Sequence, residues 1–141
     1  MGVPVEQVER IPAGNLRVPR AAFAAVWAAA QARTREQGER GVQDWYAAGV
    51  VVTCRWLAGA SHRTSWGLVQ PAAAPVTRSR ATAYEELIEA ECLAVELLPL
   101  RQPDLVADRP GWREGIRATL WWAWRGEGPP PLDVPRQADT G

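Results

Sequence analysis

Bulky apolar residues recur at intervals of three and four along four segments of the chain. This spacing matches the 3.6-residue turn of an α-helix rather than the two-residue repeat of a strand. It predicts helices over residues 19–37, 42–59, 83–98 and 110–125. Within the second segment, Val50–Thr53 is β-branched and leaves a strand as the alternative. The length of the surrounding pattern favours a helix there.

Local signals support the boundaries of the last two helices. Thr82 and Glu85 have the T-x-x-E spacing of a capping box, in which each side chain bonds the backbone N–H of the other residue. Pro99 is expected to end that helix because it cannot donate to the preceding turn. Pro110 suits the first turn of the next helix, and Gly126 suits its C-terminal cap.

These elements predict an all-α protein, a compact bundle of about four helices in a single domain. Residues 1–18 are expected to form an irregular N-terminal arm, residues 19–126 the helical domain, and residues 127–141 a Pro-rich extended or disordered tail. The connection over residues 59–81 is rich in Gly, Ser, Thr and Pro, and we expect one short turn over 103–107. A connection this long is uncommon in a compact domain and often carries function or is disordered.

The composition is typical of a globular protein, with 47% hydrophobic and 23% charged residues. Every basic residue is Arg, and Ala, Gly and Pro are abundant, as in GC-rich bacterial genomes. The net charge is zero, but no acid occurs between Asp44 and Glu85. This segment either faces the acidic helix that follows it or presents a basic surface to a partner.

The sequence predicts no catalytic residue, cofactor or metal site. His62 is the single histidine, no G-x-S-x-G or phosphate-binding loop is present, and the E-x-x-E of Glu86 and Glu89 lacks a later E-x-x-D. Cys54 and Cys92 lie in apolar helical patterns, which predicts buried free thiols. Glu91 lies near the apolar stripe of its helix and needs a buried partner, for which Arg78 or Arg80 is the candidate.

Tryptophan carries the leading functional hypothesis, a non-enzymatic protein–protein interaction or regulatory module. Eight Trp in 141 residues is a high content, and Trp and Arg are enriched at interface hot spots. The last helix is apolar around much of its circumference, so a partner protein or a second copy is expected to cover it. The candidate interface residues are Trp112, Arg117, Trp121, Trp122, Trp124 and Arg125.

Two alternatives remain open. The first is a nucleic-acid-associated protein that uses the acid-free segment 55–80, where arginines could contact phosphates and an indole could stack on a base. Its candidate contacts are Arg55, Arg63, Trp66, Arg78 and Arg80. The second is a small-molecule-binding protein or small enzyme with a Trp-lined pocket.

No stretch of 18 uninterrupted apolar residues occurs, which predicts no membrane span. Residues 21–32 are apolar but mostly Ala, and Glu6 and Glu9 precede them, which argues against a secretory signal. A cytoplasmic location is therefore expected.

Overall fold

The structure, a computed structural model, describes residue 3 and residues 5–134, with the backbone alone at 62 and 63. The predicted all-α architecture is confirmed. Its longer helices are α2 (Arg20–Glu39), α3 (Trp45–Leu57), α4 (Glu85–Arg101) and α6 (Trp112–Thr119). Residues Leu120–Trp124 continue α6 as a π-helical turn, η2.

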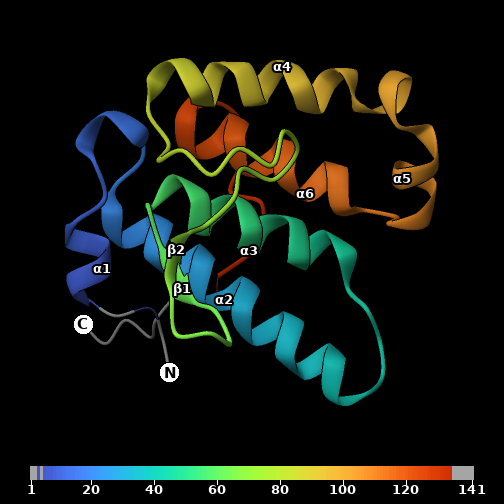
Figure 1. Ribbon diagram of the computed structural model, residues 1–141, viewed down its shortest axis with the longest axis horizontal. Helices are drawn as coiled ribbons and strands as arrows, with labels where there is room; N and C mark the ends of the chain where they lie inside the picture. Colours follow the sequence, from blue (N-terminus) through green and yellow to red (C-terminus); the bar gives the residue numbers. More distant parts are fainter. Residues whose placement is uncertain (1–2, 4, 135–141) are drawn as a thin grey trace.

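The four long helices pack in the order α2, α3, α6, α4 across the molecule (Figure 1). α3 and α6 occupy the middle, and α4 and α2 each lie at an outer edge. The short helix α5 (Pro103–Asp108) joins α4 to α6, close to the predicted turn over 103–107. Among the largest fully buried side chains are Phe23, Trp27, Trp56, Leu57, Ile88, Leu98, Ile116 and Leu120.

Two glycines allow α3 and α6 to approach until their backbones touch. A Cβ atom at Gly49 would overlap the carbonyl oxygen of Trp112, and one at Gly115 would overlap the carbonyl oxygen of Tyr46. Gly is the residue that permits so close an approach, despite its poor helix propensity. This contact fixes the centre of the fold.

α4 begins and ends later than predicted. Its N-cap is Tyr84 rather than Thr82, so the predicted capping box is wrong. The reason is tertiary: Trp56 Nε1 donates to the Ala81 carbonyl (3.3 Å) and Asn15 Nδ2 donates to the Ala83 carbonyl (3.2 Å), which holds residues 81–83 outside the helix.

Pro99 does not end α4, which continues to Arg101. A proline at this position removes the N–H that would bond to the Val95 carbonyl. In the fold, Arg113 Nε donates to that carbonyl instead, at 2.8 Å. An arginine from α6 thus replaces the missing backbone donor, and the helix tolerates its proline.

The N-terminal arm is more ordered than expected. It contains the helix α1 (Val5–Glu9) and a 3-10 turn, η1 (Ala13–Asn15). Ile11 is buried, and the buried Asn15 Nδ2 also donates to the Leu57 carbonyl at 2.9 Å. The arm is therefore part of the packed domain.

The connection between α3 and α4 contains a β-hairpin that the sequence analysis did not predict. Its antiparallel strands are β1 (Ser61–Arg63) and β2 (Val69–Pro71). A loop over residues 72–84 then crosses the helices to reach α4 (Figure 1).

The beginning of the predicted tail packs on the helical domain. Tyr46 Oη donates to the Pro131 carbonyl at 2.8 Å, and Leu132 is buried. The remainder of the predicted extended or disordered tail, residues 135–141, lies outside the described residues. Over the described part of the chain, no helix combines the length and apolar character needed to cross a membrane.

We expect α3 to lose stability at acid pH through its cap, Asp44. Burial alone would raise the pKa of Asp44, but the N–H of Ala47 (3.0 Å) and the guanidinium of Arg33 (2.6 Å) outweigh burial and lower this pKa below its ordinary 3.8. A carboxyl group whose pKa is lower in the folded state stabilises the fold at pH values above its unfolded-state pKa. This stabilisation is lost as the pH falls through the folded-state pKa.

In Asp44→Asn, the side-chain oxygen can still cap the helix, but the side chain has no carboxyl group to titrate. In urea titrations at pH 7 and pH 3, the wild-type protein should therefore lose more unfolding free energy on acidification than the variant. Equal losses would contradict this role of Asp44.

Candidate anion-binding site

The structure separates the six residues of the predicted interface into two groups. Trp112, Trp122 and Trp124 are buried, and Trp122 stacks on Phe23 with ring centroids 6.4 Å apart. The side chains that reach the surface are those of Trp121, Arg117 and Arg125.

Trp121 is half-buried between two arginines of its own chain. The guanidinium carbons of Arg117 and Arg125 lie 4.4 Å and 4.8 Å from its ring centroid. Arg117 pairs with Glu96, and Arg125 pairs with Glu89 at 3.2 Å. The cationic groups on this side of η2 already have partners within the fold.

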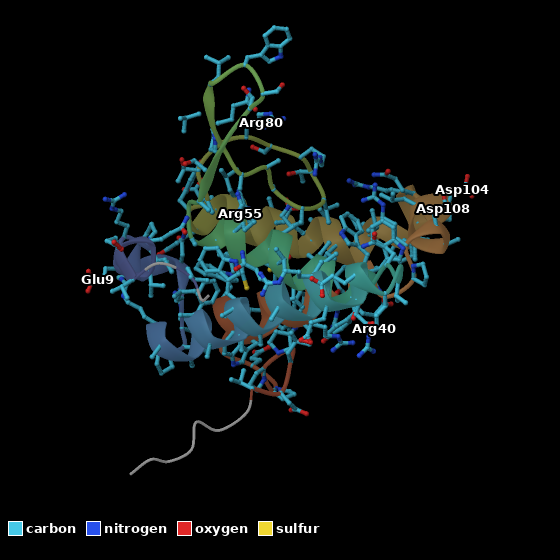
Figure 2. The ribbon with its side chains drawn as sticks, turned by 90° about the horizontal axis from the view of Figure 1, so that it is seen from below. Glu9, Arg40, Arg55, Arg80, Asp104 and Asp108 are labelled. Carbon is cyan, nitrogen blue, oxygen red and sulfur yellow. The ribbon has the colours of Figure 1, made fainter. Side chains whose placement is uncertain are left out.

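The arginines of the acid-free segment lie differently. Arg55 from α3 and Arg78 and Arg80 from the 72–84 loop line one pocket of about 270 Å³. Arg55 and Arg80 lie on the side of the helices from which the hairpin projects (Figure 2). Among the described residues, no carboxylate forms an ion pair with any of the three. Three arginines without an ion pair among the described residues therefore line one pocket, an arrangement that suits an anion.

Glu91 holds the loop that carries two of these arginines. This carboxylate, 1% exposed, accepts hydrogen bonds from the backbone N–H groups of Val76 and Thr77 and from Thr77 Oγ1 (2.8 Å). The predicted pairing of Glu91 with Arg78 or Arg80 is therefore wrong. Backbone and hydroxyl donors satisfy the buried charge, which leaves both guanidiniums to the pocket.

The backbone of Arg78 is in a left-handed conformation, with φ 66°. Its N–H donates to the Ala74 carbonyl (3.1 Å), and the Ala74 N–H donates to the Ser79 carbonyl (2.8 Å), so the turn is closed on itself. A residue other than glycine pays a steric cost in this conformation, and such residues concentrate at functional sites. Arg78 lines the pocket described above and also a second one.

The second pocket, also about 270 Å³, shares Arg78 with the first. Its polar lining is Arg78, Gln102 and Arg109, and its apolar lining includes Trp112. The guanidinium carbon of Arg109 lies 4.8 Å from the Trp112 ring centroid and 5.3 Å from that of Trp45. We call the four arginines Arg55, Arg78, Arg80 and Arg109 the arginine track.

The hairpin that precedes the 72–84 loop carries an exposed aromatic group. Trp66 at its tip is 87% exposed, and Leu68 and Val69 are also exposed. Thr64 Oγ1 accepts from the N–H groups of Trp66 (3.3 Å) and Leu68 (3.1 Å), which shapes the tip. The side chain of Arg63, the fifth predicted nucleic-acid contact, lies outside the described part of the structure.

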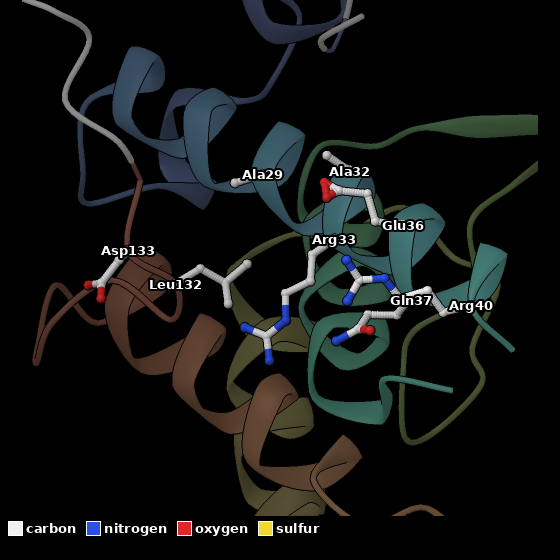
Figure 3. A pocket seen from close by; sticks show the side chains of 8 residues that line it. All are labelled: Ala29, Ala32, Arg33, Glu36, Gln37, Arg40, Leu132 and Asp133. Carbon is white, nitrogen blue, oxygen red and sulfur yellow. The ribbon is translucent and has the colours of Figure 1, made fainter. Parts of the chain in front are cut away.

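A larger groove, of about 590 Å³, runs between α2 and residues 132–133 (Figure 3). Its charged lining residues are Arg33, Arg40, Glu36 and Asp133, and Arg33 is already paired with Asp44. Two carboxylates line this groove and one of its two arginines is already paired, so the groove does not favour an anion. It is a weaker candidate than the arginine track.

The two cysteines are both free and buried. Burial raises the pKa of the Cys54 thiol far above its ordinary value. Burial also raises the pKa of Cys92, although Arg125 acts in the opposite direction. Both thiols are therefore protonated at neutral pH, a poor state for a nucleophile or a metal ligand. The described residues contain no group of three His, Cys, Asp or Glu side chains placed to hold a metal ion.

Sequence reasoning identified Arg55, Arg78 and Arg80, and the structure brings them together. It missed Arg109 and Gln102, which lie beyond α4 in the chain and reach the track only through the fold. Comparison with known protein families, with curated proteins and with solved structures found no match to this chain.

Proposed function

We propose that this protein is a non-enzymatic module that binds single-stranded nucleic acid along the arginine track. The observation that carries the proposal is the convergence of Arg55, Arg78 and Arg80 on one pocket without a carboxylate partner. Guanidinium groups bind phosphate oxygens through paired N–H donors, so each pocket suits one phosphate of a polymer.

A polymeric ligand is supported by the sharing of Arg78 between two pockets. A single inorganic anion would occupy one of them, whereas a chain of phosphates could occupy both and bridge them through Arg78. Four arginines in succession also match the electrostatic pattern of proteins that follow a nucleic-acid backbone. The neutral net charge of the chain does not oppose this, since the acids lie outside the 45–84 segment.

A single strand is favoured over a duplex by Trp66. Its exposed indole can stack on an unpaired base but finds no free base face within a duplex. Residues 66–72 connect Trp66 to the first pocket, at most roughly 20 Å at about 3.3 Å per strand residue. A strand of a few nucleotides can therefore reach the pocket and the indole together.

The test is anisotropy of a fluorescein-labelled dT12 oligonucleotide titrated with protein at several salt concentrations. Neutralisation of three to four phosphates predicts a slope of log K against log salt of about −2 to −3, at roughly −0.7 per phosphate. The triple variant R55A/R78N/R80A should reduce this slope by about 2 units, since each arginine removed forfeits one contact of this size. Asn is used at position 78 because it tolerates the left-handed backbone.

Trp66→Ala should behave in a different way. It should weaken binding about 5- to 150-fold, as expected for one stacked base, and leave the salt slope unchanged. A control triple variant, R10A/R35A/R40A, removes the same charge from exposed positions away from both pockets. Equal losses in the two triple variants, or no binding at low salt, would overturn the proposal.

A further inference from the structure

α4 is apolar on two opposite sides. Its inner side contributes Ile88, Cys92, Val95 and Leu98 to the core. On its outer side, Leu93 is 61% exposed and Leu100 is 81% exposed. An outer helix of a single domain ordinarily presents polar residues to water, so these leucines need an explanation.

The outer leucines belong to a regular stripe. Ala90, Leu93, Leu97 and Leu100 follow one another at intervals of three, four and three residues. This is the spacing with which one helix packs against another in a coiled coil. The stripe is roughly 15 Å long at about 1.5 Å per residue, and α6 covers α4 only from the other side (Figure 1).

The charges around the stripe indicate which helix would cover it. Glu89 and Glu96 flank it on one side, and each is already paired with an arginine of its own chain. Glu86 in the first turn and Arg101 in the last turn have no ion pair among the described residues. α4 thus has an uncompensated negative charge at its start and an uncompensated positive charge at its end.

We infer that α4 pairs in antiparallel orientation with α4 of a second copy of this chain. A two-fold axis near residues 93 and 94 sets Glu86 of one copy against Arg101 of the other, twice per dimer. It also sets the small Ala90 against Leu97 of the second copy. The two exposed leucines then lie opposite apolar residues, Leu93 opposite Ala94 and Leu100 opposite Leu87. A parallel pairing would oppose Glu86 to Glu86 and Arg101 to Arg101, and is disfavoured by charge repulsion.

The dimer is expected to be weak. The stripe offers two largely exposed leucines per copy, far less than the roughly 800 Å² per partner of a standard stable interface. The inference does not depend on nucleic-acid binding, because neither pocket of the arginine track is lined by a residue of α4.

Sedimentation velocity over protein concentrations from about 10 to 500 μM tests the inference, since a weak isologous dimer associates in this range. The wild-type protein should shift from monomer towards dimer, and L93E/L100E should remain monomeric with a similar circular-dichroism spectrum. Val42→Glu, a control at another exposed apolar residue, should associate like the wild type.

Charge exchange tests the orientation. E86R and R101E should each weaken association at least fivefold, because each sets like charges against one another. The double variant E86R/R101E should recover it to within about twofold of the wild type. A strictly monomeric wild type, or a double variant as weak as the single ones, would overturn the antiparallel pairing.

Discussion

Gly115→Ala should destabilise the fold by about 3 kcal/mol, the upper end of the range for overpacking a core. The added methyl group would overlap the carbonyl oxygen of Tyr46, and the backbone of Val50 lies close behind it. Because the obstacle is backbone rather than a flexible side chain, α3 and α6 would have to separate. Urea denaturation monitored by circular dichroism measures the change.

Gly38 provides the matched control. It lies within α2, and a Cβ atom there would meet no other atom within 4 Å. Gly38→Ala should therefore stabilise the protein by about 0.5–1 kcal/mol through helix propensity alone. A Gly115→Ala protein as stable as the wild type would contradict the described approach of α3 and α6.

Glu91→Ala should have the second large effect, a loss of about 3 kcal/mol. The substitution removes a charged acceptor of three hydrogen bonds from residues 76 and 77 and leaves a cavity beneath the loop. Since this loop positions Arg78 and Arg80, dT12 binding should weaken as well, although no arginine has been removed. Denaturation and anisotropy on the same variant measure the two losses.

Glu91→Gln separates these effects. Its amide oxygen can still accept from the backbone, and the Thr77 hydroxyl can turn to accept from the amide nitrogen. We expect it to recover most of the binding lost in Glu91→Ala. Glu36→Gln, at an exposed position of α2 without an ion pair among the described residues, should change neither quantity by a comparable amount. Undiminished binding by Glu91→Ala would show that the loop does not depend on this carboxylate.

The periodicity of apolar residues was sufficient to predict the four long helices. It failed where a distant residue decides the local conformation. Thr82 has the pattern of a helix cap, but Asn15 and Trp56 hold the backbone at 81–83 in a different conformation. Pro99 has the pattern of a helix end, but Arg113 supplies the missing hydrogen bond.

The hairpin escaped prediction because each of its strands has three residues, too few to establish a two-residue repeat. The exposure of individual tryptophans could not be predicted for another reason. The π-helical turn η2 changes which side chains face inward, and Trp122 and Trp124 are both buried while Trp121 lies nearer the surface. The spacing of apolar residues was interpreted with the period of a regular α-helix, which does not include a π-helical turn.

Only some members of the arginine track could be predicted from the sequence. Its members in the 55–80 segment are marked by the absence of acids around them, a property of the sequence alone. Arg109 is followed within a few residues by Glu114 and preceded by Asp108, so its neighbours along the chain give no such signal. Its place beside Arg78 depends on the packing of α5 and α6 against the loop.

NMR of the arginine side chains tests most directly whether the arginine track holds the phosphates of a single strand. In a titration with dT12, the Nε–Hε resonances of Arg55, Arg78, Arg80 and Arg109 should shift together and saturate at one concentration. The resonances of Arg35 and Arg40, which line neither pocket of the track, should stay in place. Shifts confined to Arg35 and Arg40, or no shifts in any of the six at low salt, would contradict the account.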